Sequence, residues 1–352
     1  MNNQEETKIN KYFAAANSYL GFVSFFDVVF PSKFFDRIYV LKGGPGTGKS
    51  SFMKKISTAL KEKKCQVDEI YCSSDPHSLD GVIAKNNEKK IAIIDGTAPH
   101  ERDAIIPGAI DEIINLGDDW DNLWLTANKE KILSLANEKS LAYKTAYSYL
   151  KIAGGCDELI HNNYGSFFNK SKAKSKAEEL FVDIYPLEEN TSSIKLLSSF
   201  GLLGQHRLDV NKSQFSRYIG VGGEDHSALL LINFFADFLK AKGISFVRLP
   251  YPLIPEYNEG LYVWQYDLMI LKDIFSDINA DKFISDDKVN IERTKHAKEL
   301  KTDALSEAQR WFSIASDIHF QLEDIYGIAM NFTKNDEIFD KKIIEISNIL
   351  EL

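Results

Sequence analysis

The chain contains 352 residues, of which 44% are hydrophobic and 26% charged, so it is long enough for two domains with sizeable cores. Its formal net charge of −9 argues against a generally nucleic-acid-binding surface, and we expect no nucleic-acid partner. No segment has the length and apolarity of a membrane span, and three cysteines, Cys65, Cys72 and Cys156, match neither a disulfide nor a metal spacing. These features predict a cytoplasmic protein with no membrane partner.

Residues 12–35 are rich in aromatic side chains, including Phe22, Phe26 and Phe30. Aromatic residues in front of a nucleotide site could stack on a base, or they could cover a sheet and belong to the core. We favour a place in the core.

A short apolar run, residues 37–41, leads into a glycine-rich stretch that continues into an amphipathic helical pattern. The stretch matches the spacing of a phosphate-binding P-loop, in which Gly43 is followed by four residues and then by Gly48, Lys49 and Ser50. Its backbone N–H groups and the positive end of the following helix would bind phosphate. The predicted nucleotide-binding residues are Gly43, Gly44, Pro45, Gly46, Thr47, Gly48, Lys49, Ser50 and Ser51.

Two further residue types complete the expected chemistry of such a loop. Lys49 would reach the β- and γ-phosphates, and the hydroxyl of Ser50 would ligate Mg²⁺. Residues 91–94 form an apolar strand pattern that ends in Asp95, the Walker B arrangement for a second Mg²⁺ ligand. The sequence therefore predicts that ATP and Mg²⁺ bind in the first half.

The segment between Lys49 and Asp95 is predicted to contain one strand, residues 66–72, and one short helix. The strand ends in the polar residues 73–77, and ligands of open α/β sheets bind at such carboxyl ends. Asp75 could position a water or a substrate hydroxyl there, or support the metal; alternatively, it could form an Asx-Pro turn and cap the next short helix.

Residues 96–102 follow Asp95 and contain two further candidates for phosphate contact, His100 and Arg102. We assign His100 a possible catalytic role beside Lys49 and Asp75, whereas a surface loop is at least as good an interpretation for Arg102. Asp95 is followed by Gly96 and not by the water-activating glutamate of many ATPase motors, which leaves a kinase function open.

Helical patterns follow this segment. Residues 107–116 begin with a proline, which is typical of a first helical turn, and predict a helix. Residues of about 126–182 predict a helical hairpin that projects from the α/β core and could meet a protein partner. The lysines at 170–176 in this hairpin are expected to form a solvated face.

The second half repeats features of the first. Residues 217–221 again form an apolar run before glycines, and Tyr149 and Tyr164 match Trp311 and Tyr326 at one constant offset of 162 residues. The second loop carries Glu224, Asp225 and His226 where a P-loop has glycine and lysine, and carboxylates there would repel phosphate.

We therefore predict an α/β protein with two tandem P-loop NTPase-like domains, each a mostly parallel sheet flanked by helices and extended by a helical hairpin. The first domain is expected at residues 1–190. The second, at residues 191–352, has a degenerate loop and a hairpin at about 289–350.

The motifs resemble those of an uncharacterised bacterial family of tandem P-loop ATPases. The similarity rests on residues 42–50, 72–75, 78–83, 95–100 and 107–117, and on residues 319–330 in the second half. It implies ATP binding by two fused P-loop domains with helical extensions. The chain departs from the family pattern at the second loop, so the resemblance implies one nucleotide site.

Three functions follow from these patterns. The first is a Mg²⁺-dependent ATPase with one competent site and a pseudo-NTPase second half. The second is a kinase that transfers the γ-phosphoryl group to a small molecule. The third is a nucleotide-gated binding module that hydrolyses little ATP.

Overall fold

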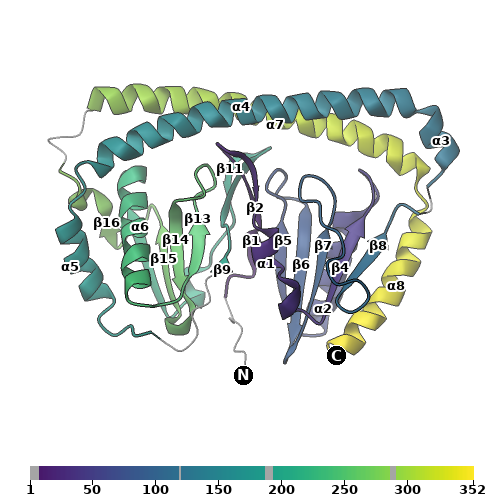
Figure 1. The fold of residues 1–352 in the computed structure, drawn as a ribbon, viewed down its shortest axis with the longest axis horizontal. Helices are drawn as coiled ribbons and strands as arrows, with labels where there is room; N and C mark the ends of the chain where they lie inside the picture. Colours follow the sequence, from purple (N-terminus) through teal and green to yellow (C-terminus); the bar gives the residue numbers. More distant parts are fainter. Residues whose placement is uncertain (1–7, 119, 187–192, 286–290) are drawn as a thin grey trace.

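The computed structural model describes residues 8–118, 120–186, 193–285 and 291–352. Two six-stranded sheets lie side by side beneath a pair of long helices that crosses both of them (Figure 1). Each sheet comes from one half of the chain and is flanked by helices, which agrees with the predicted tandem α/β architecture. The expected boundary at residues 190 and 191 lies outside the described residues.

The first sheet has the strand order β1-β5-β6-β7-β4-β8, in which β6 runs antiparallel to its neighbours and the other pairs are parallel. Its strands are β1 (Lys11–Phe13), β4 (Arg37–Lys42), β5 (Gln66–Tyr71), β6 (Leu79–Asn86), β7 (Lys89–Asp95) and β8 (Asp111–Asn115). The strands predicted at residues 37–41, 66–72 and 91–95 are confirmed.

Two expectations for this sheet are wrong. The short helix expected before Asp95 is instead β6, whose apolar residues Val82, Ile83 and Ala84 are buried between two partner strands. The helix expected at residues 107–116 is instead β8, which extends the sheet beside β4. In both segments the backbone finds its hydrogen-bond partners on other strands, which local helical patterns do not reveal.

The second sheet repeats the first. Its order is β16-β12-β15-β14-β13-β9, and β14 is again antiparallel to both neighbours. The strands are β9 (Ser193–Ile194), β12 (Arg217–Gly222), β13 (Val247–Pro250), β14 (Asn258–Val263), β15 (Leu268–Lys272) and β16 (Ile278–Asn279). The equal order and equal directions support the repeat that the sequence predicts.

A shared core lies between the two sheets. Each half adds a hairpin near it. Several aromatic side chains of residues 12–35 belong to this core, as expected: Phe26, Phe30 and Phe35 are buried together with Val247 and Tyr262 of the second sheet, while Phe13 is buried in a smaller separate cluster. The smaller elements are the hairpin strands β2 (Ala15–Ser18), β3 (Gly21–Ser24), β10 (Ser198–Gly201) and β11 (Gly204–Arg207), the helix α1 (Phe26–Val29), and the 3₁₀ helices η1 (Ser32–Phe34), η2 (Lys212–Gln214), η3 (Trp264–Tyr266) and η4 (Ala280–Phe283).

The outer face of each sheet is covered by the helix that follows its first long strand. Helix α2 (Lys49–Glu62) packs on the first sheet through Phe52, Met53 and Ile56, and α6 (Asp225–Ala241) packs on the second. Strand side chains alternate between the two faces, so Tyr39 meets α2 while Ile38 faces the shared core.

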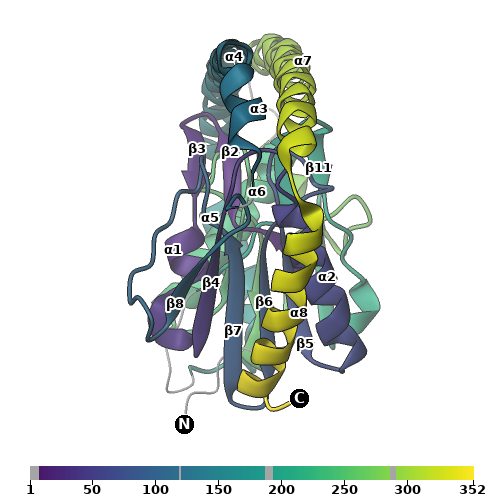
Figure 2. The ribbon, with the colours of Figure 1, turned by 90° about the vertical axis from the view of Figure 1, so that its right-hand side faces the viewer.

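Two long helices connect the halves across the top of the molecule. Helix α4 (Lys129–Gly165) has 37 residues and α7 (Ile291–Ala329) has 39, which correspond to lengths of about 55 Å and 58 Å. They lie side by side (Figure 2) and run antiparallel, since Asp121, just before α3 (Asn122–Ala127), donates to the oxygen of Ala329 while Asp157 near the other end pairs with Lys301.

The expected helical hairpins at about 126–182 and 289–350 are therefore wrong. The apolar side of α4 is covered by α7 and not by the next helix of its own half, because small residues such as Ala146, Ala153 and Ala308 let the two long helices approach closely.

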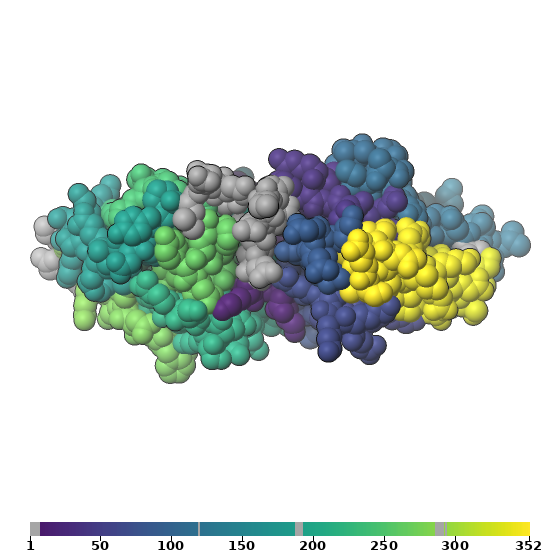
Figure 3. All heavy atoms as spheres, turned by 90° about the horizontal axis from the view of Figure 1, so that it is seen from below, coloured from purple at the N-terminus to yellow at the C-terminus, as the bar shows by residue number. Residues whose placement is uncertain are grey.

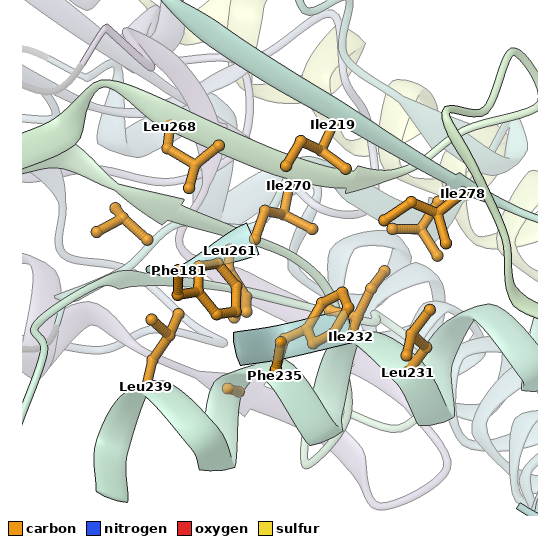
Figure 4. Close-up of a cluster of buried hydrophobic side chains, with 14 of the residues drawn as sticks. Phe181, Ile219, Leu231, Ile232, Phe235, Leu239, Leu261, Leu268, Ile270 and Ile278 are labelled. Atoms are coloured by element: carbon orange, nitrogen blue, oxygen red, sulfur yellow. The ribbon is translucent and has the colours of Figure 1, made fainter. Parts of the chain in front are cut away.

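The last helix of each half packs on the sheet of the other half. Helix α5 (Lys170–Leu180) packs on the second sheet, and Phe181 lies beside Leu261 and faces Phe235 and Leu239 of α6 (Figure 4). Helix α8 (Phe332–Ile349) packs on the first sheet, where Ile346 and Leu350 join the core under α2. Figure 3 shows these C-terminal residues in yellow against blue residues of the first half.

None of the helices in the described part of the chain combines the length and the apolarity that a membrane crossing needs.

The exchange of α8 can be tested by core truncation. Ile346 is 1% exposed, so Ile346→Ala is expected to lower the free energy of unfolding by about 3 kcal/mol through lost burial and a cavity. Ile344 on the same helix is 63% exposed, and Ile344→Ala should change it by less than about 0.5 kcal/mol. Urea unfolding followed by circular dichroism measures both, and equal losses would contradict this packing.

Candidate functional site

The glycine-rich loop, residues 43–48, joins β4 to α2, so the strand–loop–helix context expected for it is present. Gly46 and Gly48 have φ angles of +68° and +84°, in the left-handed region that glycine adopts without strain. Helix α2 begins directly afterwards at Lys49, and the N–H groups of its first turn have no partners within the helix. The loop thus directs a set of N–H donors and the positive helix end towards one place.

Lys49 lies folded over this loop. Its Nζ donates to the backbone oxygens of Gly43 at 3.1 Å and Gly44 at 3.0 Å, and lies 3.8 Å from Oδ2 of Asp95. The structure thus brings together the predicted lysine, the loop and the predicted strand-end carboxylate.

Asp95 and Ser50 are the two predicted Mg²⁺ ligands. Asp95 ends β7 opposite Leu41, and its Oδ1 accepts hydrogen bonds from the backbone N–H of Thr97 at 2.9 Å and from its hydroxyl at 2.6 Å. The Oγ of Ser50 accepts the N–H of Leu79 at 3.0 Å. A hydroxyl and one fixed carboxylate suit Mg²⁺, which keeps several waters and substrate phosphate oxygens in its shell.

Within the described residues, no cluster of three or more histidine, cysteine, aspartate or glutamate side chains could hold a metal ion. The Ser50 and Asp95 pair fits a metal that the substrate helps to bind.

Asp80 is a site residue for which the sequence analysis assigned no role. It lies near the start of β6, one position before Gly81, which pairs with Ile94 of the antiparallel strand β7. Asp80 and Asp95 therefore lie at the same edge of the sheet on adjacent strands. Its Oδ2 lies 3.3 Å from Nε2 of His100, and both residues are 7% exposed. Burial, together with the charge of Asp95, raises the pKa of Asp80 well above its ordinary value, while burial lowers the pKa of His100.

The two candidates after Asp95 have different surroundings. The ring of His100 packs against Phe26 with centroids 4.6 Å apart, and its Nδ1 lies 3.2 Å from the oxygen of Thr97. Arg102 is buried and donates to the oxygen of Phe30, so the surface loop expected for it is wrong. Its guanidinium lies 3.7 Å from Asp111 and ties the segment to β8.

Asp75 follows β5 as expected. Its Oδ1 accepts the N–H of His77 at 3.0 Å, which matches the alternative interpretation of a capped turn. The negative charge of Asp75 also acts on Asp80. Together with burial and the charge of Asp95, it raises the pKa of the Asp80 carboxyl. The carboxylate of Asp75 is thus close to the site, and one of its oxygens stabilises a turn.

The loop is covered by helices from the second half, which the sequence analysis did not predict. Nδ2 of Asn335 in α8 donates to the oxygen of Thr47 at 2.9 Å. A Cβ atom on Gly46 would lie 2.8 Å from the backbone oxygen of Glu323 in α7. Only glycine therefore fits at this point between the loop and α7.

The equivalent connection in the second half is shorter. Only residues 223–224 separate β12 from α6, whereas residues 43–48 separate β4 from α2. Oε2 of Glu224 accepts the N–H of His226, so a carboxylate already caps the helix end. Lys272 stands where the first half has Asp95, because it pairs with Val221 as Asp95 pairs with Leu41.

A buried ion cluster, Asp157, His226 and Lys301, holds α4, α6 and α7 together beside this closed loop. The Nε2 of His226 lies 3.1 Å from Oδ1 of Asp157, which also accepts a hydrogen bond from Lys301. Burial alone would raise the pKa of Asp157, but the hydrogen bond from His226 and the charge of Lys301 outweigh it and keep the pKa below its ordinary value.

Comparisons of the chain with protein-family models, curated proteins and solved structures find no match. The geometry of the site is therefore the evidence that bears on function.

The ion cluster predicts a strong stability effect. Asp157→Ala should lower the free energy of unfolding by about 3–5 kcal/mol at pH 7, because it leaves Lys301 without its counter-charge and His226 without its hydrogen-bond partner. Since the folded-state pKa of Asp157 is lowered, its contribution is present above the ordinary aspartate pKa and is lost as the pH falls through the folded value. Urea unfolding at several pH values checks this, and Asp183→Ala, at an exposed position, is the control.

Proposed function

We propose that the chain is an ATP-binding protein and a Mg²⁺-dependent ATPase with one competent site at residues 43–51. One observation carries this proposal: the loop N–H groups, Lys49, Ser50 and Asp95 converge at the carboxyl ends of β4 and β7. This edge is where ligands bind in open α/β sheets.

Each of these groups has a defined part in the proposed reaction. Lys49 and the loop N–H groups would stabilise negative charge on the β- and γ-phosphates of ATP. Ser50 and Asp95 would hold Mg²⁺, which when bound neutralises charge between the same phosphates. Ser50 and Asp95 are already held by hydrogen bonds with Leu79 and Thr97, whereas Lys49 must leave the carbonyl oxygens of Gly43 and Gly44 to reach a phosphate.

Hydrolysis also requires an acceptor for the proton of the attacking water. The water oxygen forms a bond to the γ-phosphorus while the bond to the bridging oxygen breaks, and the proton passes to a nearby side chain. Asp75 is the candidate that the sequence favours, and Asp80 is a second. The raised pKa makes the Asp80 carboxylate a stronger base than an ordinary aspartate, and His100, whose Nε2 lies 3.3 Å from Asp80 Oδ2, would orient it.

Two other functions would each give a result different from that of an ATPase. A kinase would produce a phosphorylated acceptor without an equal amount of free phosphate, and the position of Gly96 after Asp95 keeps that function in consideration. A binding module would change its affinity for a partner between ATP and ADP with little turnover, and the contact of α7 with the loop supports that option.

Nucleotide binding is tested with Lys49→Met. Removal of the ammonium group should weaken ATP binding by about tenfold or more, the size of a lost charge-assisted contact. Isothermal titration calorimetry should give one site per chain in the wild type. Lys61→Met is the control, since Lys61 lies at the other end of α2 in a partly exposed pair with Glu69. Two equal sites, or an unchanged affinity in Lys49→Met, would refute the proposal.

The proton acceptor is tested by comparing Asp80→Asn with Asp75→Asn. Asp80→Asn should reduce kcat by about a hundredfold and leave ATP binding intact. Because the pKa of Asp80 is raised, wild-type kcat should increase as the pH rises through that value, and this acidic limb should be absent from the variant. Phosphate release measured from pH 5 to 9 gives kcat for each variant. If only Asp75→Asn reduces kcat, Asp75 and not Asp80 is the proton acceptor.

A further inference from the structure

The covering of the loop by α7 and α8 is tight and specific. A Cβ atom on Gly44 would lie 3.1 Å from the ring of Tyr326, and one on Gly46 would meet both the backbone oxygen and the Cα of Glu323. The ring of Tyr326 also packs against Trp120, with centroids 5.6 Å apart. The end of α7 is thus seated on the loop by backbone and side-chain contacts together.

The carboxylate of Glu323 accepts a hydrogen bond from the loop, where the phosphate of the proposed nucleotide would accept one. Glu323 accepts hydrogen bonds from His319 and from the backbone N–H of Gly46, and together with the charge of Lys49 these lower its pKa. Successive backbone N–H groups of such a loop form a concave site for anions. Glu323 therefore acts as an internal anion on the loop.

A second lysine lies in the same group of charges. Nζ of Lys139 in α4 is 3.4 Å from Nδ1 of His319, and Nε2 of His319 is 3.5 Å from Oε1 of Glu323. Burial and the charge of Lys49 lower the pKa of Lys139, so the two ammonium groups act on each other. Lys49 already lies 3.8 Å from Asp95, so Glu323 is the carboxylate beside Lys139 in this group.

The repeat provides a comparison for this group. At the offset of 162 residues that relates Tyr164 to Tyr326, Lys301 corresponds to Lys139, Asp157 to His319 and His161 to Glu323. Beside the second loop, the carboxylate of Asp157 is held by His226, and the side chains of Asp157 and His226 are 1% and 3% exposed. Beside the first loop, the side chains of His319 and Glu323 are 40% and 37% exposed, so they have room to rearrange.

We propose that Glu323 and Lys139 form a nucleotide-responsive latch over the loop: Glu323 holds the N–H of Gly46 when no nucleotide is bound, and ATP displaces it and pairs its terminal phosphate with Lys139. This inference rests on the proposed nucleotide site and assigns the second half a part in it. Helices α7 and α4 pair along their length. Displacement of Glu323 would therefore couple nucleotide binding at the loop to the packing of both sheets. By linkage, anything that pulls α7 away from the loop favours ATP by the same factor.

The test is calorimetric titration of the full chain with ATP and with ADP, each with Mg²⁺. Glu323→Gln removes the competing charge and should tighten both nucleotides by about tenfold. Lys139→Met should weaken ATP by about tenfold and leave ADP unchanged, since only ATP carries the terminal phosphate. A purely structural role of Lys139 would affect both nucleotides alike.

Matched controls lie on the same two helices. Glu307→Gln on α7 and Lys144→Met on α4 are exposed positions away from the loop and should bind both nucleotides as the wild type does. Thermal melting verifies folding, and Lys139→Gln replaces Lys139→Met if the latter melts early.

The outcomes separate this inference from the proposed function. Unchanged or weaker binding by Glu323→Gln, or an equal loss of ATP and ADP by both Lys139 variants, would overturn the latch while ATP binding by the wild type upholds the site. No saturable binding of ATP by the wild type would overturn both.

Discussion

The antiparallel pairing of α4 and α7 is the contact on which the rest of the structure depends. Alanines along both helices allow close approach, and the same pairing carries α5 onto the second sheet and α8 onto the first. Each sheet is therefore closed on its outer face by one helix of its own half and one of the other. The core of either half is incomplete without the partner half, although all residues lie on one chain.

Local sequence patterns predicted those parts of the fold that depend on neighbouring residues. The apolar runs of β4, β5 and β7 and the helix after Lys49 are readable because burial and backbone pairing coincide with short, regular segments. The strand β6, in contrast, carries Asp80 and Gly81 at its start, and β8 follows Pro107 and Gly108, so both lack a clean strand pattern. The helical hairpins were expected because an amphipathic helix must cover its apolar side, but the sequence does not say which helix covers it.

The candidate site divides in the same way. Lys49, Ser50 and Asp95 could be predicted, because a loop spacing and a strand end constrain where their side chains lie. The contact of Asp80 with His100 depends on the position of β6 within the sheet, and the seat of Glu323 on Gly46 depends on the crossing of α7. These contacts join residues that are distant in the chain, and a single sequence contains no signal for them.

The exchange of helices has a consequence for how the two halves can differ. A symmetric dimer of identical chains repeats every substitution in both subunits, so it cannot keep a loop in one subunit and shorten it in the other. A single chain that contains both halves has no such restriction. Here the first half retains residues 43–48 while the second retains only residues 223–224, and Lys272 replaces the strand-end aspartate. Covalent fusion thus permits a division of labour, with one half free to become the scaffold that the other half requires.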